Sequence, residues 1–176
     1  MSFAIFGGCV DAVGQGPAEE LEPGLQPAPI ILQAEGIAHG ESLIFPFGSA
    51  KPEVIAMLEL FGQVDQDTNE ECGAGAMDFL SSFATGLTLN FQKDQLVGWF
   101  FDGHGNAART AQDITVGSSR ATLEDAMQIE IQNDSTIGVE FFSDFGGGGF
   151  IGGFLSDEED DATVESLYAG TNCFFR

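Results

Sequence analysis

FPFGSAKPEVIA, residues 45–56, is the stretch that decides the fold, because a degenerate copy, DITVGSSRATLE, occurs at residues 113–124. The two copies share the core Gly-Ser-x-Lys/Arg-x-x-Val/Leu. A second pair of related segments, residues 96–103 and 163–170, recurs at nearly the same spacing. A whole unit is therefore predicted to be duplicated, giving two tandem repeats at about 41–103 and 113–176.

Each repeat is predicted to be a helix followed by an antiparallel hairpin. After Gly48 and Ser49, helical spacing places four apolar residues on one face: Val54, Met57, Leu58 and Phe61. Strands are expected at about 86–91 and 95–101, and the second repeat is expected to have a helix at 120–127 and strands at about 137–142 and 164–168. The predicted fold class is α+β, with two tandem helix-then-antiparallel-hairpin units forming one curved sheet with helices on one face.

The composition is strongly acidic. The 176 residues carry 28 acids against five bases, a net charge of −23, and 43% of the residues are hydrophobic. A real core can form, but the surface repels phosphate backbones, so nucleic acid is excluded as a partner. The acidity fits solubility or salt adaptation, and it also fits a cationic partner or Ca²⁺.

The first 40 residues are predicted to be an apolar stub and a disordered, Pro/Ala-rich linker. Cys9 follows an apolar run that ends in two glycines, which is the shape of a lipoprotein processing site, although the basic segment before it is missing. Cys9 is therefore a lipidation candidate that would anchor the chain to a membrane. No segment reaches the length of a transmembrane span.

The other two cysteines, Cys72 and Cys173, flank most of the presumed folded region. We expect them to form a disulfide, which would imply an oxidising compartment. The alternative is three reduced cysteines in a cytosolic protein. In that case Cys72 could act with a histidine such as His104 as a thiol enzyme or hydrolase.

No catalytic, cofactor or metal site is predicted. The acidic run 157–161 lacks the glycine and the spacing of a calcium loop. The glycine run 146–149 has no lysine after it to hold a phosphate. Neither His39 nor His104 has a partner at metal-ligand spacing. A calcium-responsive acidic module remains a further alternative.

Aromatic residues in the last strand of each repeat are the candidates for binding a partner. If the helices cover the side of the sheet that carries Phe100, then Trp99, Phe101 and Tyr168 line the opposite face. Trp and Tyr are frequent anchor residues at protein interfaces. The alternative is that these three side chains simply fill the core.

The repeated openings Gly48-Ser49-Ala50-Lys51-Pro52-Glu53-Val54 and Gly117-Ser118-Ser119-Arg120-Ala121-Thr122-Leu123 resemble those of the β-lactamase-inhibitor-protein-like architecture. BamE/SmpA-type outer-membrane lipoproteins share one such unit. The resemblance implies a curved antiparallel sheet with helices on its convex side, a concave face that binds protein, and no catalysis. The sequence thus predicts a non-enzymatic, periplasmic or other extracytoplasmic protein with a binding or scaffolding role, anchored at the outer membrane if Cys9 is lipidated.

Overall fold

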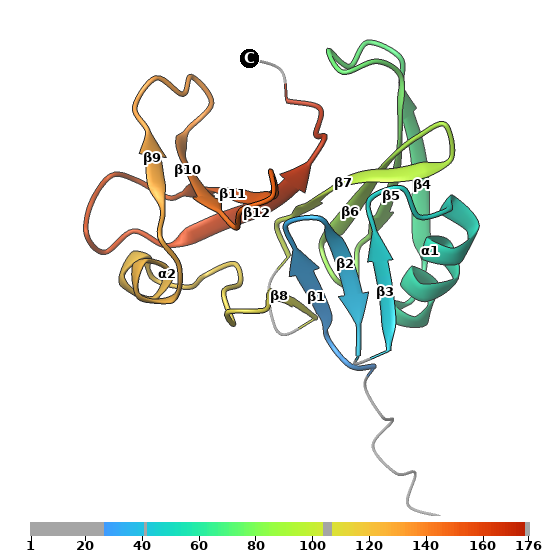
Figure 1. Cartoon of the computed structure of the whole chain (residues 1–176), viewed down its shortest axis with the longest axis horizontal. Helices are drawn as coiled ribbons and strands as arrows, with labels where there is room; N and C mark the ends of the chain where they lie inside the picture. The colour runs from blue at the N-terminus through green and yellow to red at the C-terminus, as the bar shows by residue number, and fades with distance from the viewer. Residues whose placement is uncertain (1–26, 41, 104–106, 175–176) are drawn as a thin grey trace, which may run out of the picture.

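The computed structural model describes residues 27–40, 42–103 and 107–174, and in these ranges the protein is mostly β. An eight-stranded antiparallel sheet forms the body of the molecule (Figure 1). Its strands, in spatial order, are β4 (Val64–Asn69), β5 (Met77–Ser82), β6 (Leu87–Gln92), β7 (Gln95–Phe101), β12 (Val164–Gly170), β11 (Phe150–Leu155), β10 (Val139–Asp144) and β9 (Glu130–Gln132). Two four-stranded meanders, β4–β7 and β9–β12, therefore join where β7 pairs with β12.

A second, four-stranded sheet packs against the first. Its order is β3 (Leu43–Pro46), β2 (Gly36–His39), β1 (Ile30–Gln33) and β8 (Ala108–Thr110), and the pairing of β1 with β8 is parallel. Strands β1 and β2 lie inside the range that the sequence analysis assigned to the linker. They form because Ile30, Leu32 and Ile37 are completely buried, a two-residue turn joins them, and β8 supplies a partner from far along the chain.

Two short helices precede the meanders. Helix α1 (Lys51–Leu58) runs into the 3-10 turn η1 (Glu59–Phe61), and α2 (Arg120–Ala126) is capped by the Ser119 hydroxyl, which accepts from Thr122 N–H at 3.2 Å. The first helix has no side-chain cap at its N-terminus.

The repeated Gly-Ser sequence fastens each helix to the last strand of its own meander. Gly48 N–H donates to Leu96 O at 2.7 Å, and Gly117 N–H donates to Val164 O at 2.8 Å. Both glycines have positive φ, 98° and 87°, which a residue with a side chain adopts at a cost. The same backbone geometry thus explains why this part of the sequence recurs.

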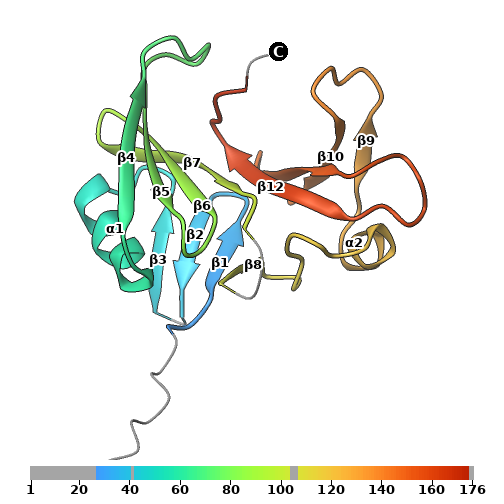
Figure 2. The same cartoon turned by 180° about the vertical axis from the view of Figure 1, so that it is seen from behind.

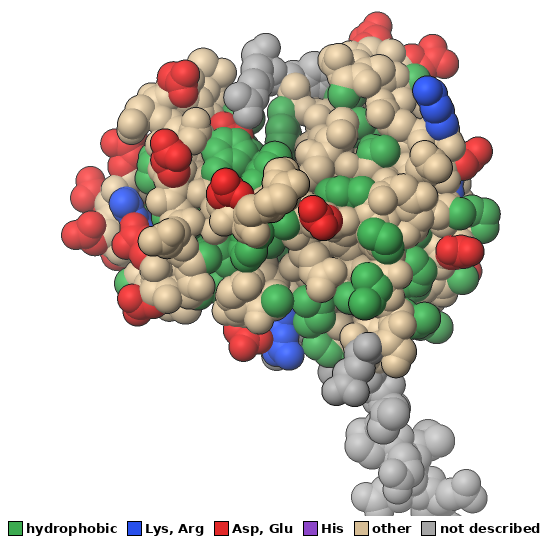
Figure 3. Space-filling view, viewed as in Figure 1, with side chains coloured by type: hydrophobic (Ala, Val, Ile, Leu, Met, Phe, Trp, Pro, Cys, Tyr) green, Lys and Arg blue, Asp and Glu red, His purple; other side chains and the backbone are tan. Residues whose placement is uncertain are grey.

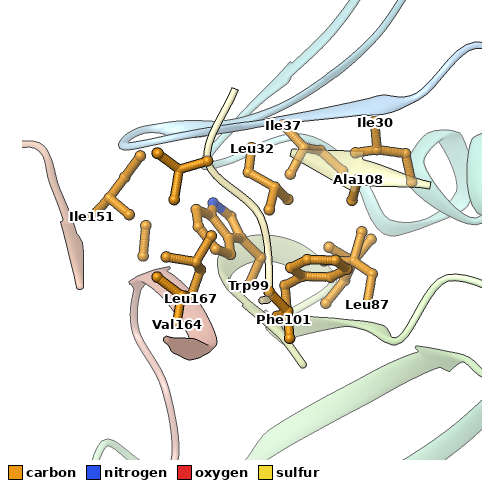
Figure 4. Close-up of a cluster of buried hydrophobic side chains, with 14 of the residues drawn as sticks. Ile30, Leu32, Ile37, Leu87, Trp99, Phe101, Ala108, Ile151, Val164 and Leu167 are labelled. Atoms are coloured by element: carbon orange, nitrogen blue, oxygen red, sulfur yellow. The ribbon is translucent and has the colours of Figure 1, made fainter. Parts of the chain in front are cut away.

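The core lies on one face of the eight-stranded sheet. Trp99 and Phe101 from this sheet meet Leu32 and Ile37 from the small sheet (Figure 4), and Val54 of α1 belongs to the same hydrophobic cluster. The small sheet and both helices thus contribute to the core on this one side. The face of the eight-stranded sheet that points away from the core is its outer face.

The predicted α+β fold of helix-then-hairpin units in a single sheet is wrong. The protein has two sheets and only two short α-helices in the described ranges, and each half of the large sheet has four strands. Of the additional strands, β4 was not predicted because it is polar, and the short β9 overlaps residues 128–131, whose sequence fits a connector or a strand. They lie at the edges of the sheet, where β4 exposes most of its side chains and therefore lacks an apolar pattern.

Candidate binding face

One row of side chains crosses the outer face from edge to edge. Residues directly opposite each other on paired strands share a face of the sheet, so the row can be followed through the strand register. Its members are Asp65, Ser81, Thr88, Phe100, Tyr168, Gly152, Phe142 and Glu130. The row has carboxylates at both ends and aromatic rings in the middle.

An aromatic cluster occupies the centre of this face. Its rings come from β7, β10, β11, β12 and the C-terminal segment: Phe100, Phe142, Phe150, Phe154, Tyr168 and Phe174. Tyr168 and Phe174 have their ring centroids 4.8 Å apart, and most of these contacts are edge-to-face. Tyr168 is buried, but the five phenylalanines remain partly exposed, so the cluster is half core and half surface.

Tyr168 is held in this cluster by a polar contact. Its hydroxyl donates to Glu140 Oε1 at 2.5 Å, and both side chains are buried. The ring lies over Gly152 of the intervening strand, since a Cβ at that position would stand 2.5 Å from Tyr168 Cζ. Position 152 of β11 is therefore one where a side chain would collide with the tyrosine.

The C-terminal segment, residues 171–174, crosses part of the outer face. Asn90 Nδ2 donates to Thr171 O at 2.9 Å and to Asn172 Oδ1 at 2.8 Å. In Figures 1 and 2 this segment leaves β12 and runs between the two halves of the large sheet. It covers only the middle of the face.

A pocket of about 280 Å³ opens beside this segment. The rings of Phe79, Phe100 and Phe174 and the side chain of Asn90 are among the groups that line it. Carboxylates flank it at the β4 edge, because Asp67 pairs with Phe79 in the strand register. The pocket is thus aromatic in its lining and acidic at its margin.

The charged side chains on the strands of this face are all acidic, and the base Lys93 lies in the β6–β7 turn beside them. The strands of the eight-stranded sheet contain no Lys or Arg within their described bounds. Three described bases elsewhere are paired with carboxylates: Lys51 with Asp78, Arg120 with Glu124 and Arg109 with Asp113. In Figure 3 hydrophobic side chains gather between the two halves of the molecule and acidic side chains surround them.

The three predicted partner-binding residues do not share one surface. Trp99 and Phe101 are completely buried in the core, and Trp99 Nε1 donates to Gln33 O at 2.8 Å. Tyr168 lies on the outer face, opposite Phe100 in the register. The prediction assigned the helices to the side of Phe100, whereas the helices and the small sheet lie on the side of Trp99. The sequence reasoning missed the five phenylalanines of the aromatic cluster, including Phe100 next to Tyr168.

Cys72 and Cys173 do lie together. Cys72 is in the β4–β5 loop, within hydrogen-bonding reach of Cys173, and Asn69 Nδ2 approaches Cys173 Sγ at 3.7 Å. Both are free thiols, and no disulfide joins them in the structure. Burial, followed by the hydrogen bond to Cys72, raises the pKa of Cys173 to about 11, the opposite of what a nucleophilic thiol requires.

The remaining candidates are Cys9 and the two histidines. Cys9 and His104 lie outside the described residues. His39 packs edge-on against Phe61, with ring centroids 5.4 Å apart. Among the described residues no group of His, Cys, Asp and Glu could hold a metal ion, and no helix is long and apolar enough to span a membrane.

The chain matches no protein family model, no curated protein and no solved structure at a significant level. The resemblance to β-lactamase-inhibitor-like and BamE/SmpA-type proteins therefore stays a prediction.

Proposed function

We propose that this protein is a non-enzymatic binding protein that holds a protein partner on the outer face of its large sheet. The observation that carries the proposal is the central aromatic cluster, which lies on the sheet face opposite the core and keeps five phenylalanines partly exposed. A sheet that only had to fold would carry polar residues on a face left to solvent. Aromatic rings at the centre of a patch with a polar rim are typical of protein interfaces.

The face is large enough for a specific complex. Seven of the eight strands have six or seven residues and are about 20 Å long, β9 has three, and with strands about 4.8 Å apart the face measures roughly 35 by 20 Å. That is comparable with the area of about 800 Å² that each partner buries in a standard interface. A partner could therefore cover the aromatic cluster together with its acidic margins.

The partner is proposed to be basic. The chain has a net charge of −23, and the outer row ends in Asp65 and Glu130. An opposite charge on the partner would speed its encounter with this face and orient it, while acidic partners would be repelled.

We also propose that the protein is extracytoplasmic and that Cys9 carries a lipid anchor. An extracytoplasmic compartment is supported by the proximity of Cys72 and Cys173, which are far apart in the sequence and adjacent in space. Lipidation of Cys9 would tether the binding domain to a membrane.

Site-specific cross-linking tests the proposed function. A photoreactive phenylalanine analogue replaces Phe142 in the aromatic cluster and, as a matched control, Phe83, which is 85% exposed in the β5–β6 turn. We expect the probe at position 142, and not the one at 83, to cross-link one basic protein in the native host. Identical products from both positions, or none from 142, would refute the proposal.

A further inference from the structure

We infer that the pocket between Phe79, Phe100 and Phe174 binds an arginine side chain of the basic partner. This inference rests on the proposed function and names the anchor that the partner would insert. It follows from three properties of the pocket: its walls, its hydrogen-bonding groups and the charge around it.

The walls suit a flat cation on an apolar stem. Phe100 and Phe174 stand at 70° to each other with centroids 6.0 Å apart, which makes an aromatic corner, and Phe79 lines the same space. A guanidinium group stacks on such rings, while the methylene groups of arginine pack against their edges. A volume of about 280 Å³ accommodates one long side chain rather than a larger ligand.

The polar lining favours a group that only donates hydrogen bonds. Asn90 uses its Nδ2 to hold Thr171 O and Asn172 Oδ1, and its buried Oδ1 accepts no hydrogen bond from the described residues. Asn90 lines the pocket, so a donor that moved past the lining to this buried oxygen would satisfy it. Arginine has five donors and no acceptor, whereas a carboxylate would find no free amide hydrogen there.

The surrounding charge favours a cation, and desolvation favours arginine over lysine. Asp67 and Asp65 lie on the neighbouring edge strand and share the face of Phe79 and Ser81. An ammonium group is more strongly hydrated than a guanidinium, so it would lose more hydration free energy on entering an aromatic pocket. The combination of rings, an acceptor and nearby carboxylates therefore selects arginine.

The test uses the full chain and three small probes, the Nα-acetyl amides of arginine, lysine and tyrosine. Binding is followed by the NMR shifts of the Asn90 side-chain amide and of the Phe79 and Phe100 backbone amides. We expect the arginine probe to move these signals in a saturable way and to bind about five-fold more tightly than the lysine probe. Equal binding of arginine and lysine, or preferential binding of tyrosine, would overturn the inference.

Two variants test the walls. Phe174→Ala removes one ring near the end of the chain, and Phe79→Leu keeps the apolar volume but removes the aromatic face. Each is expected to weaken arginine binding by about five-fold, while Phe83→Ala leaves it unchanged. Unchanged affinity in a folded Phe174→Ala or Phe79→Leu protein contradicts the inference.

The cross-link at position 142 separates this inference from the proposed function, because Phe142 is on the other half of the sheet. A specific cross-link without arginine binding would retain the binding face and remove the arginine anchor. Arginine binding without a cross-link would support the pocket and remove the protein partner.

Discussion

Tyr168 on β12 donates a hydrogen bond to Glu140 on β10, and the bond passes over β11, where Gly152 provides the space. It buries a carboxylate beneath an aromatic cluster on a sheet face that lies outside the main core. The contact therefore ties the aromatic cluster to the second meander.

Removal of the tyrosine hydroxyl in Tyr168→Phe is expected to lower the free energy of unfolding by about 1.5–3 kcal/mol, because a buried carboxylate loses a hydrogen-bond donor. Urea denaturation of Tyr168→Phe, of Glu140→Leu, which removes the acceptor, and of the double variant measures the coupling. A coupling energy near zero would show that the two groups contribute independently.

A methyl group at Gly152 is expected to displace the tyrosine. The new Cβ of Gly152→Ala would lie 2.5 Å from Tyr168 Cζ, so we expect a loss of about 1–3 kcal/mol in unfolding free energy. Gly73→Ala is the matched control, since nothing lies within 4 Å of its new Cβ. If both variants have the same denaturation midpoint, the ring does not lie over Gly152 in solution.

The Cys173 thiol is expected to resist alkylation near neutral pH, because the raised pKa of about 11 leaves little thiolate. Labelling should accelerate as the pH approaches 11, and Cys72→Ala should accelerate it at lower pH by removing the sulfur that accepts the hydrogen bond from Cys173. The pKa of Cys173 in the folded protein lies above its ordinary value of 9.0. Its protonated thiol therefore contributes to the free energy of unfolding below pH 9, and this contribution is lost as the pH rises toward 11. Equal labelling rates in folded and denatured protein at pH 8 would contradict this.

The adjacent thiols are also expected to join when an oxidant is present. A small disulfide such as oxidised glutathione would accept two electrons and two protons from Cys72 and Cys173 and would be reduced to two thiols. Intact-mass and peptide mapping of protein from its own host, alkylated without reductant, measures this pairing. A linked 72–173 peptide supports export, and three labelled cysteines argue against it.

Lys51 joins the start of α1 to β5 through Asp78, with 2.8 Å between Nζ and Oδ2. The hydrogen bond from Lys51, followed by that from Thr68, lowers the pKa of Asp78 below its ordinary value of 3.8. The Lys51–Asp78 ion pair therefore contributes to the free energy of unfolding above pH 4, and its contribution is lost as the pH falls through the pKa of Asp78 in the folded protein. Because Asp78 is 36% exposed, Asp78→Asn should cost only about 0.5–1 kcal/mol at pH 7, and the cost should shrink as the pH falls below 4.

Local sequence predicted the parts of the fold that local interactions decide. The segments at Gly48 and Gly117 both need a positive φ before a helix, and the same Gly-Ser sequence therefore occurs at both places. Strands β6 and β7 were found because one face of each is buried in the core. Edge strand β4 was missed, since a polar edge strand has no apolar period to detect.

The candidate site depended on which side of the sheet the core would occupy. The alternation in β7 separates Trp99 and Phe101 from Phe100, but it does not say which set faces inward. Strands β1 and β2 determine which set faces inward. Their buried residues precede Trp99 by more than 60 positions in the sequence and cover its side of the sheet.

The sequence by itself thus determined the duplication, the acidic surface and the approximate positions of β6, β7, β10 and β12, because these follow from residue type and spacing. The tertiary structure decided the second sheet, the exposed aromatic face, the pocket at Asn90 and the meeting of Cys72 with Cys173. Each of these requires segments distant in the chain to come together, and only the packing of the whole chain brings them into contact.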